Sequence, residues 1–264
     1  MSDLKIIVCA KQIPDPEAPF SSVTVDTEKR KVEVDAPDVI NPFDENALEA
    51  ALRIKETMGC HITVVSLGAS LSDTVLRKAI AAGANELVLI EDPVFEELDS
   101  NSTAYALSKA IEQLGDFDLI LTGRQAGDWD AGQVGSVLAE ILNIPCITMA
   151  CGIKVEDGHV IVDKTIPGAI EVVKAKMPAL VTVSNEVGEL RYVSRSKLLA
   201  MLRKRIPMKK WKADQLNLAP DLLSQVGLLE LLTPPDMRRD CVLIEGSSPE
   251  EKAAELAKII KSLI

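Results

Sequence analysis

The sequence predicts an α/β protein built on a doubly wound, mainly parallel sheet. Short apolar runs alternate with amphipathic stretches through the first half of the 264-residue chain, an order typical of β-α-β-α folds. Residues 6–8 and 119–121 are continuously apolar, as expected of strands buried on both faces. Residues 45–58 repeat apolar side chains at helical spacing. Right-handed crossovers around a parallel core follow from this order.

The same patterns place the individual elements. Strands are predicted over residues 5–10, 62–66, 86–90 and 119–122, and helices over 45–58, 73–82, 102–114 and 133–142. Before the first helix, valines at 23, 25, 32 and 34 alternate with polar residues on both sides of a charged turn, which predicts a surface hairpin. Beyond Pro145, an Asp157-Gly158 turn signal between alternating segments predicts antiparallel strands that extend or edge the parallel sheet.

The last quarter of the chain has a looser pattern. From Leu190 onward a basic, partly helical stretch is followed by a segment rich in leucine and proline, and then by an amphipathic helix over residues 249–264. We therefore predict an α/β domain over residues 1–189 and an extended arm over 190–264.

Composition excludes several kinds of function. A formal charge of −11 argues against general nucleic-acid binding, which needs an excess of Lys and Arg. No apolar run reaches the roughly 18 residues of a membrane span, so we expect a cytoplasmic protein. The 5 cysteines form no CxxC pair and there are only 2 histidines. Neither a disulfide framework, a metal site nor histidine catalysis is expected.

The clearest functional signal follows the fourth predicted strand. TGRQAGDWDAGQVG, residues 122–135, leads from a buried strand through glycines and aspartates into an amphipathic helix. In that setting backbone N–H groups meet phosphate, and Arg124 supplies a full charge. The segment is neither a Walker loop nor a GxGxxG motif. Spacing alone supports equally well the alternative that Asp128 and Asp130 cap the helix while the glycines form a turn.

Two further loops are expected at the same edge of the sheet. In DVINPFD, residues 38–44, Asn41 offers an amide, Pro42 fixes the backbone and Asp44 can cap the following helix. After the second strand, the main chain of residues 66–68 can approach an adenine edge, although a helix cap is an equal alternative for Ser66.

Four stretches together resemble the beta subunit of electron transfer flavoproteins and span most of the chain: VCAKQIPD, NPFDENALEAALRIKE, TGRQAGDWDAGQVG and VDKTIPGAIEVVKAKMPALVTV. The last is similar to the family signature in Lys164, Glu171 and the proline-led strand over 178–182. It departs from that signature at Pro167-Gly168-Ala169, where the family has an acidic residue and paired glycines. The resemblance implies an adenine nucleotide alpha hydrolase-like fold and an electron-transfer subunit rather than a stand-alone enzyme.

The resemblance also implies cofactors and partners. An alpha subunit would hold a redox FAD, while this chain would hold FAD or AMP. Gln133-Val134-Gly135 is similar to members with a second FAD, whereas AMP-binding members have Gln-Thr-Gly, so FAD is expected. Those relatives take hydride from NADH and divide the electron pair between two acceptors, which implies electron bifurcation with NADH or a dehydrogenase as partner. The loops and the resemblance together give these candidate nucleotide-binding residues: Cys9, Asn41, Pro42, Phe43, Asp44, Ser66, Leu67, Gly123, Arg124, Gln125, Ala126, Gly127, Asp128, Asp130, Gly132, Gln133 and Val134.

The start of the arm is strongly basic in an acidic protein. Residues 191–212 are rich in Lys and Arg, and Leu198 and Leu199 lie on a predicted helix within them. The resemblance implies a loop that recognises partner dehydrogenases, in which Arg195 replaces a leucine found in some relatives. Arg195, Leu198 and Leu199 are therefore candidate docking residues. A basic face that covers the alpha subunit is an equal alternative, and membrane-surface binding is a weaker one.

Two other classes of function compete with an electron carrier. One is a free-standing adenine-nucleotide sensor of the universal stress type, and the other is an ATP-using hydrolase or ligase. Neither needs a long arm, and an ATP-cleaving enzyme is expected to show a lysine-bearing phosphate loop.

Overall fold

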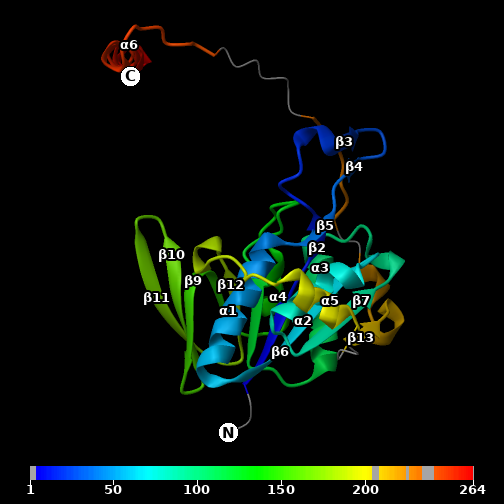
Figure 1. Cartoon of the computed structure of the whole chain (residues 1–264). Helices are drawn as coiled ribbons and strands as arrows, with labels where there is room; N and C mark the ends of the chain where they lie inside the picture. The colour runs from blue at the N-terminus through cyan, green and yellow to red at the C-terminus, as the bar shows by residue number, and fades with distance from the viewer. Residues whose placement is uncertain (1–3, 204–207, 224–225, 234–240, 264) are drawn as a thin grey trace.

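A computed structural model of the chain describes residues 4–203, 208–223, 226–233 and 241–263. Within them, the main sheet has nine strands in the order β11-β10-β9-β12-β8-β1-β6-β7-β13. Helices pack on both faces of this sheet (Figure 1). The predicted doubly wound α/β fold is confirmed.

The centre of the sheet is parallel and its strand order reverses beside β1. On one side of β1 (Leu4–Cys9) lie β6 (Cys60–Gly68) and then β7 (Glu86–Glu91). On the other side lie β8 (Leu119–Gly123) and then β12 (Ala179–Val183). In open α/β sheets such a reversal is where ligands bind, beyond the carboxyl ends of the strands.

The faces of β1 are covered by different helix pairs. Ile6 and Val8 pack with α1 (Pro42–Met58) and α2 (Asp73–Ala82) in one core. Ile7 and Cys9 pack on the opposite face with α3 (Ser100–Leu114) and α4 (Val134–Ile141). Because successive side chains of a strand point to opposite faces, a continuous apolar run is what this three-layer packing requires.

Three strands extend the sheet at one end. β9 (Cys146–Glu156) pairs parallel with β12, and β10 (His159–Ile166) and β11 (Ala169–Lys176) follow antiparallel. The Asp157-Gly158 turn joins β9 to β10 with φ of 49° and 74°, the positive values that tight hairpins need. The antiparallel extension predicted from the sequence is confirmed.

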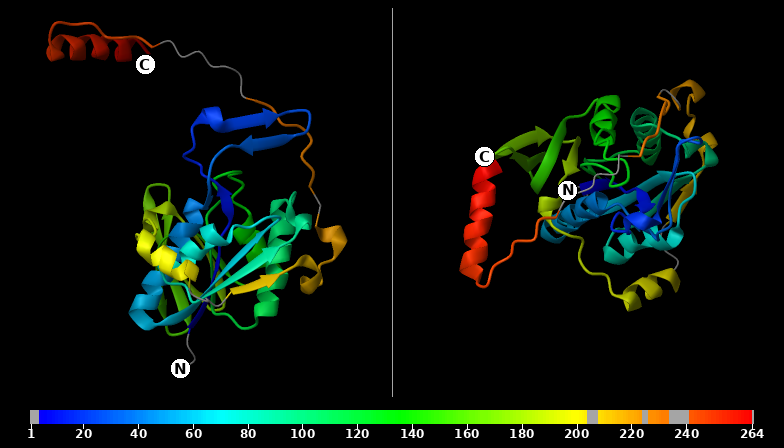
Figure 2. Two further views of the ribbon diagram at one scale, coloured as in Figure 1. Left: turned by 45° about the vertical axis from the view of Figure 1, so that its right-hand side comes forward. Right: turned by 90° about the horizontal axis from the view of Figure 1, so that it is seen from above.

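A hairpin projects above the carboxyl edge of the sheet. It consists of β3 (Val23–Asp26) and β4 (Lys31–Val34), as predicted, and is joined to the body through the pair β2 (Gln12–Pro14) and β5 (Asp38–Ile40). Arg30 Nη1 donates a hydrogen bond of 2.7 Å to the Leu228 carbonyl, so part of the arm runs beside the hairpin (Figure 2). Short 3-10 turns are η1 (Phe20–Ser22), η2 (Pro93–Phe95), η3 (Asn185–Val187), η4 (Ala213–Leu216) and η5 (Pro220–Leu222).

The arm begins close to the body and ends apart from it. It contains α5 (Arg195–Arg203), then β13 (Met208–Trp211), which pairs parallel with β7, and finally α6 (Pro249–Leu263). The main sheet therefore extends past residue 190, while α6 buries none of its residues (Figure 1). Ile264, the predicted last residue of that helix, lies outside the described residues. None of the described helices combines the length and apolarity needed to cross a membrane.

A buried carboxylate fastens the start of the arm to α1. Glu49 accepts hydrogen bonds from Arg191 N at 3.1 Å, Arg191 Nε at 3.0 Å and Arg53 Nε at 3.1 Å. Burial raises the pKa of Glu49, but the hydrogen bonds from Arg191 outweigh it and hold the pKa below its usual value. The segment that leads into α5 is thus held by charge-assisted bonds.

Glu49→Ala tests this attachment. The variant leaves the Arg191 side chain without its main acceptor, so the free energy of unfolding should fall by about 1–3 kcal/mol. Glu112→Ala removes an exposed pair with Lys109 and should cost less than about 0.5 kcal/mol. Urea unfolding compares the two, and equal losses would show that Glu49 does not hold the arm.

Candidate functional site

The predicted site lies at the reversal of strand order, where β1 runs between β8 and β6. The segment after β1, the first turn of α1 and residues 124–133, here called the 124–133 loop, meet at this edge. Most of the candidate nucleotide-binding residues are brought together there, although they come from separate parts of the sequence.

Asp44 joins the ends of the two central strands to α1. Its carboxylate accepts hydrogen bonds from Lys11 N at 2.7 Å and Gly123 N at 2.9 Å, and the residue is 7% exposed. A Cβ on Gly123 would lie 2.5 Å from Asp44 Oδ1 and 2.7 Å from the Phe43 carbonyl carbon, so only glycine fits. The reading of Asp44 as a helix cap is wrong, because α1 already begins at Pro42.

Burial at this edge raises the pKa of two side chains. Burial raises the pKa of Asp44 to about 6, even though the backbone N–H groups of Lys11 and Gly123 act in the opposite direction. Burial, reinforced by Asp44, also raises the pKa of the Cys9 thiol to about 12. Cys9 is therefore a neutral packing residue at the end of β1 rather than a thiolate nucleophile.

Asn41 shapes the loop that faces it. Its Nδ2 donates to the Gln125 carbonyl at 2.8 Å, and its Oδ1 accepts from Gly127 N at 3.1 Å. The sequence suggested an amide that could be offered to a ligand. In the structure this amide instead satisfies the main chain of the 124–133 loop and fixes its path.

The aspartates of the 124–133 loop also stabilise the loop itself. Asp128 Oδ2 lies 2.6 Å from Lys11 Nζ, and Asp130 Oδ1 accepts from Gln125 Nε2 at 2.6 Å. The residue before α4, Gln133, makes no side-chain cap. The capping alternative for Asp128 and Asp130 is therefore wrong, and no side chain at the N-cap satisfies the first N–H groups of α4.

Three buried polar atoms around this edge lack hydrogen-bond partners among the described residues: Ser66 Oγ, Thr122 Oγ1 and Arg124 Nε. Buried polar atoms are nearly always paired, so these three are available to a ligand or to water. The Arg124 guanidinium lies 4.7 Å from the centre of the Phe43 ring, a contact that holds the charge at the edge of the site. Thr122 lies beside α4, since a Cβ on Gly135 would come within 2.7 Å of its Oγ1.

The remaining candidates occupy different places. Ser66 and Leu67 lie within β6 rather than in a loop after it. Ser66 does not cap a helix, because the N-cap of α2 is Ser72, whose Oγ accepts from Val75 N at 3.4 Å. Pro42 and Phe43 are in the first turn of α1, and Ala126 and Gly132 lie in the 124–133 loop. The docking candidates Arg195, Leu198 and Leu199 are on α5, away from this edge.

Sequence reasoning missed Lys11, which both donates to Asp44 and pairs with Asp128. Its place directly after the first strand, at a point where a ligand loop was expected, was the available signal. In the described part of the chain, no group of three or more His, Cys, Asp or Glu residues could hold a metal ion.

Comparisons with known proteins agree with this geometry. Residues 31–216 match the model of the electron transfer flavoprotein domain. The chain is 40% identical to the electron transfer flavoprotein subunit beta of Thermoanaerobacterium thermosaccharolyticum over 192 residues, 72% of each chain. The chain belongs to the electron transfer flavoprotein family.

Similarity to full-length beta-type members extends further. The chain is 32% identical to the caffeyl-CoA reductase-Etf complex subunit CarD of Acetobacterium woodii over 264 residues, 98% of each chain. It is 35% identical to the electron transfer flavoprotein subunit beta of Megasphaera elsdenii over 255 residues, 91% of each chain. This electron transfer flavoprotein chain is thus an electron-transfer subunit of the beta type. A free-standing nucleotide sensor is not favoured.

Titration of Asp44 provides a test of the site. Because its pKa is 3.8 in the unfolded chain and about 6 in the folded one, the unfolded state binds fewer protons between these values. The free energy of unfolding contributed by this group therefore falls as pH rises. Urea unfolding compares the wild-type chain with Asp44→Asn, which does not titrate. Relative to this variant, the free energy of unfolding of the wild-type chain should fall by about 1 kcal/mol between roughly pH 5 and pH 7. Parallel curves for the two proteins would contradict the raised pKa.

Proposed function

We propose that this chain holds an adenine nucleotide, FAD, in the crevice between the ends of β1 and β8 and serves as the beta subunit of a heterodimeric electron carrier. The observation that carries the proposal is the position of three buried atoms, Ser66 Oγ, Thr122 Oγ1 and Arg124 Nε, at the ends of strands near a reversal of strand order. None of the three has a hydrogen-bond partner among the described residues. Ligands bind at such reversals in doubly wound sheets.

The residues at this edge fit a nucleotide. The first N–H groups of α4 carry partial positive charge and would face phosphate oxygens, with Arg124 adding a full charge. Asn41 and Asp44 would hold the loops that surround the ligand, and main-chain groups of residues 66–68 would reach the adenine edge. When bound, the flavin supplies the redox chemistry, so the chain needs to bind and orient it rather than to move protons.

Arg124→Ala tests the phosphate contact. Loss of a hydrogen bond to a charged group should weaken FAD binding roughly 10- to 100-fold, measured by calorimetry on nucleotide-depleted heterodimer. Arg124→Lys should recover part of the affinity because it keeps the charge. Arg77→Ala removes an equal charge from α2 and should leave binding unchanged. Equal affinities for Arg124→Ala and Arg77→Ala would remove Arg124 from the site.

The choice of FAD over AMP rests on the start of α4. Val134 occupies the first position of the helix and places no hydroxyl there, in contrast to the threonine of AMP-binding members. The next residue, Gly135, is pressed against Thr122 and Thr182, so the backbone at this point has no room for a side chain. The similarity to the caffeyl-CoA reductase-Etf complex subunit over nearly the whole chain supports the same choice.

Flavin counting separates the two nucleotides. Denaturing the purified heterodimer should release about two flavins per complex, one from each subunit. Chromatography of the same extract detects AMP and serves as the internal control. One flavin together with one equivalent of AMP would contradict FAD binding by this chain.

We also propose that residues 190–264 form the partner-binding arm of the nucleotide-binding domain over 1–189. On α6, Leu256, Ile260 and Leu263 are exposed at helical spacing, and such an apolar stripe is usually covered by a partner. On α5, Arg195 and Leu199 are exposed, with Leu199 at 55%, while Leu198 is half-buried. These three residues would contact a dehydrogenase or the alpha subunit.

The electron donor and the cellular site complete the proposal. Relatives named as parts of CoA reductase complexes support a reductase or dehydrogenase partner, with NADH as donor and electron bifurcation at a second flavin. The place of action would be the cytoplasm. Purification with a co-expressed alpha subunit discriminates this function from a nucleotide sensor, because a colourless monomer that binds ATP and acquires no flavin spectrum would refute the carrier.

A further inference from the structure

One ion pair joins the segments that follow β1 and β8. Lys11 comes two residues after the end of β1, and its Nζ lies 2.6 Å from Asp128 Oδ2 in the 124–133 loop, which follows β8. Because β1 and β8 are neighbours in the sheet, this pair crosses the crevice between their ends. Among the described residues, no other ion pair connects this loop to the rest of the protein.

The main chain of Lys11 is fixed at the same edge. Its N–H donates to Asp44 Oδ2 at 2.7 Å, and Asp44 also accepts from Gly123 N at the start of the loop. Burial raises the pKa of Asp44, and the charge of Lys11 is among the groups that act in the opposite direction. The side chain of Lys11 can therefore leave Asp128 without any movement of β1.

The ion pair is also the more exposed of the contacts that hold the loop. Asn41 is 1% exposed and bonds the main chain at residues 125 and 127, so these hydrogen bonds are shielded from water. The side chains of Lys11 and Asp128 are 43% and 23% exposed. Water and salt compete with an exposed pair, so it can open while the buried hydrogen bonds persist.

We propose that Lys11 is a positioning residue for the nucleotide, whose ion pair with Asp128 holds the 124–133 loop over the crevice and slows the release of the bound nucleotide. The inference rests on the proposed function, since it concerns the same crevice. When the pair opens, the tip of the loop loses its ionic link to the end of β1 and the nucleotide can leave. Lys11 acts through Asp128 and not through contact with the ligand.

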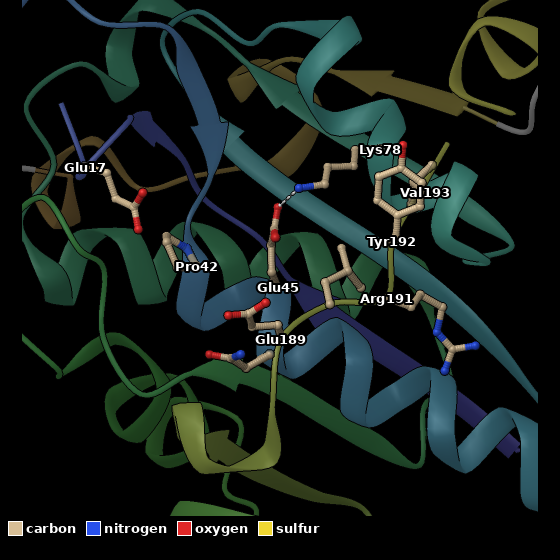
Figure 3. Close-up of a pocket in the computed structure, with 10 residues that line it drawn as sticks. Glu17, Pro42, Glu45, Lys78, Glu189, Arg191, Tyr192 and Val193 are labelled. Atoms are coloured by element: carbon tan, nitrogen blue, oxygen red, sulfur yellow. Dashed lines mark hydrogen bonds and ion pairs between the residues drawn. The ribbon is translucent and has the colours of Figure 1, made fainter. Parts of the chain in front are cut away.

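A second ion pair of the same kind lies elsewhere. A cavity of about 540 Å³ is lined by the first turn of α1, by α2 and by the segment that leads into α5, and Lys78 Nζ there lies 2.5 Å from Glu45 Oε1 (Figure 3). Glu17 and Glu189 also line this cavity and form no ion pair with any described residue. No residue of the 124–133 loop lines it, so its ion pair is separate from the attachment of the loop.

Lys11→Met and Asp128→Asn test the proposal in the complete heterodimer. Each removes one half of the pair and should raise the rate constant for FAD release, measured by stopped-flow fluorescence, about two- to fivefold. The double variant should release FAD no faster than either single variant, because both changes remove one interaction. Added salt should bring the wild-type rate closer to that of the variants.

Matched variants provide the controls. Lys78→Met removes a cation whose pair is similarly exposed, at 42% and 18%, and should leave FAD release unchanged. Lys11→Arg keeps the charge and should release FAD at nearly the wild-type rate. FAD held by the alpha-type subunit leaves in a separate phase, which none of these variants should change.

Two results for FAD release would overturn the role of Lys11. One is an increase in Lys11→Met of less than about twofold over Lys78→Met. The other is faster release in Lys11→Met together with wild-type release in Asp128→Asn, which would indicate that Lys11 contacts the phosphates directly.

Amide hydrogen exchange supplies a readout that needs no ligand. In the nucleotide-depleted heterodimer, residues 124–133 should exchange at least about twofold faster in Lys11→Met and Asp128→Asn, but not in Lys78→Met. Unchanged exchange in the first two variants overturns the proposal even where the nucleotide binds. A wild-type heterodimer that binds no adenine nucleotide refutes the proposed function, and hydrogen exchange then decides the attachment of the loop separately.

Discussion

The Asp44 carboxylate is the constraint on which the architecture of the site depends. By accepting from Lys11 N and Gly123 N, it connects the ends of β1 and β8, the strands between which the sheet order reverses. The contact is possible only because Gly123 has no side chain. Burial makes the charged form costly, as the raised pKa shows, so the carboxylate must keep both backbone donors.

From this junction the polar groups divide into two sets. Asn41, Asp128 and Asp130 are occupied in shaping the 124–133 loop. The start of α4 has no side-chain cap, and Thr122 Oγ1 and Arg124 Nε have no hydrogen-bond partner among the described residues. A rigid frame with a few unused donors suits a subunit of an electron carrier, whose cofactor performs the redox step. The raised pKa keeps the buried Cys9 thiol at the same edge neutral.

Local patterns predicted the elements well because burial on both faces leaves a continuous apolar run, as in β8, and a tight hairpin needs positive φ, as at Asp157-Gly158. The same local reasoning assigned the wrong roles to some side chains. An Asp or Ser before a helix matches a capping pattern, yet Asp44 and Asp128 found partners distant in sequence. Hydrogen-bond donors that the fold brings close from distant segments decide between such alternatives. The spacing of residues along the chain does not reveal these donors.

The sequence by itself determined the fold class, the order of the main strands and helices, and the position of the glycine-rich loop before α4, because periodicity and turn chemistry are local properties. Tertiary structure alone decided which polar groups are used internally and which remain available. It also created the acidic cavity, whose walls join Glu17, Lys78 and Glu189 from distant segments. Charge neutralisation depends on distance in space, so only the folded chain reveals that Glu17 and Glu189 form no ion pair with any described residue.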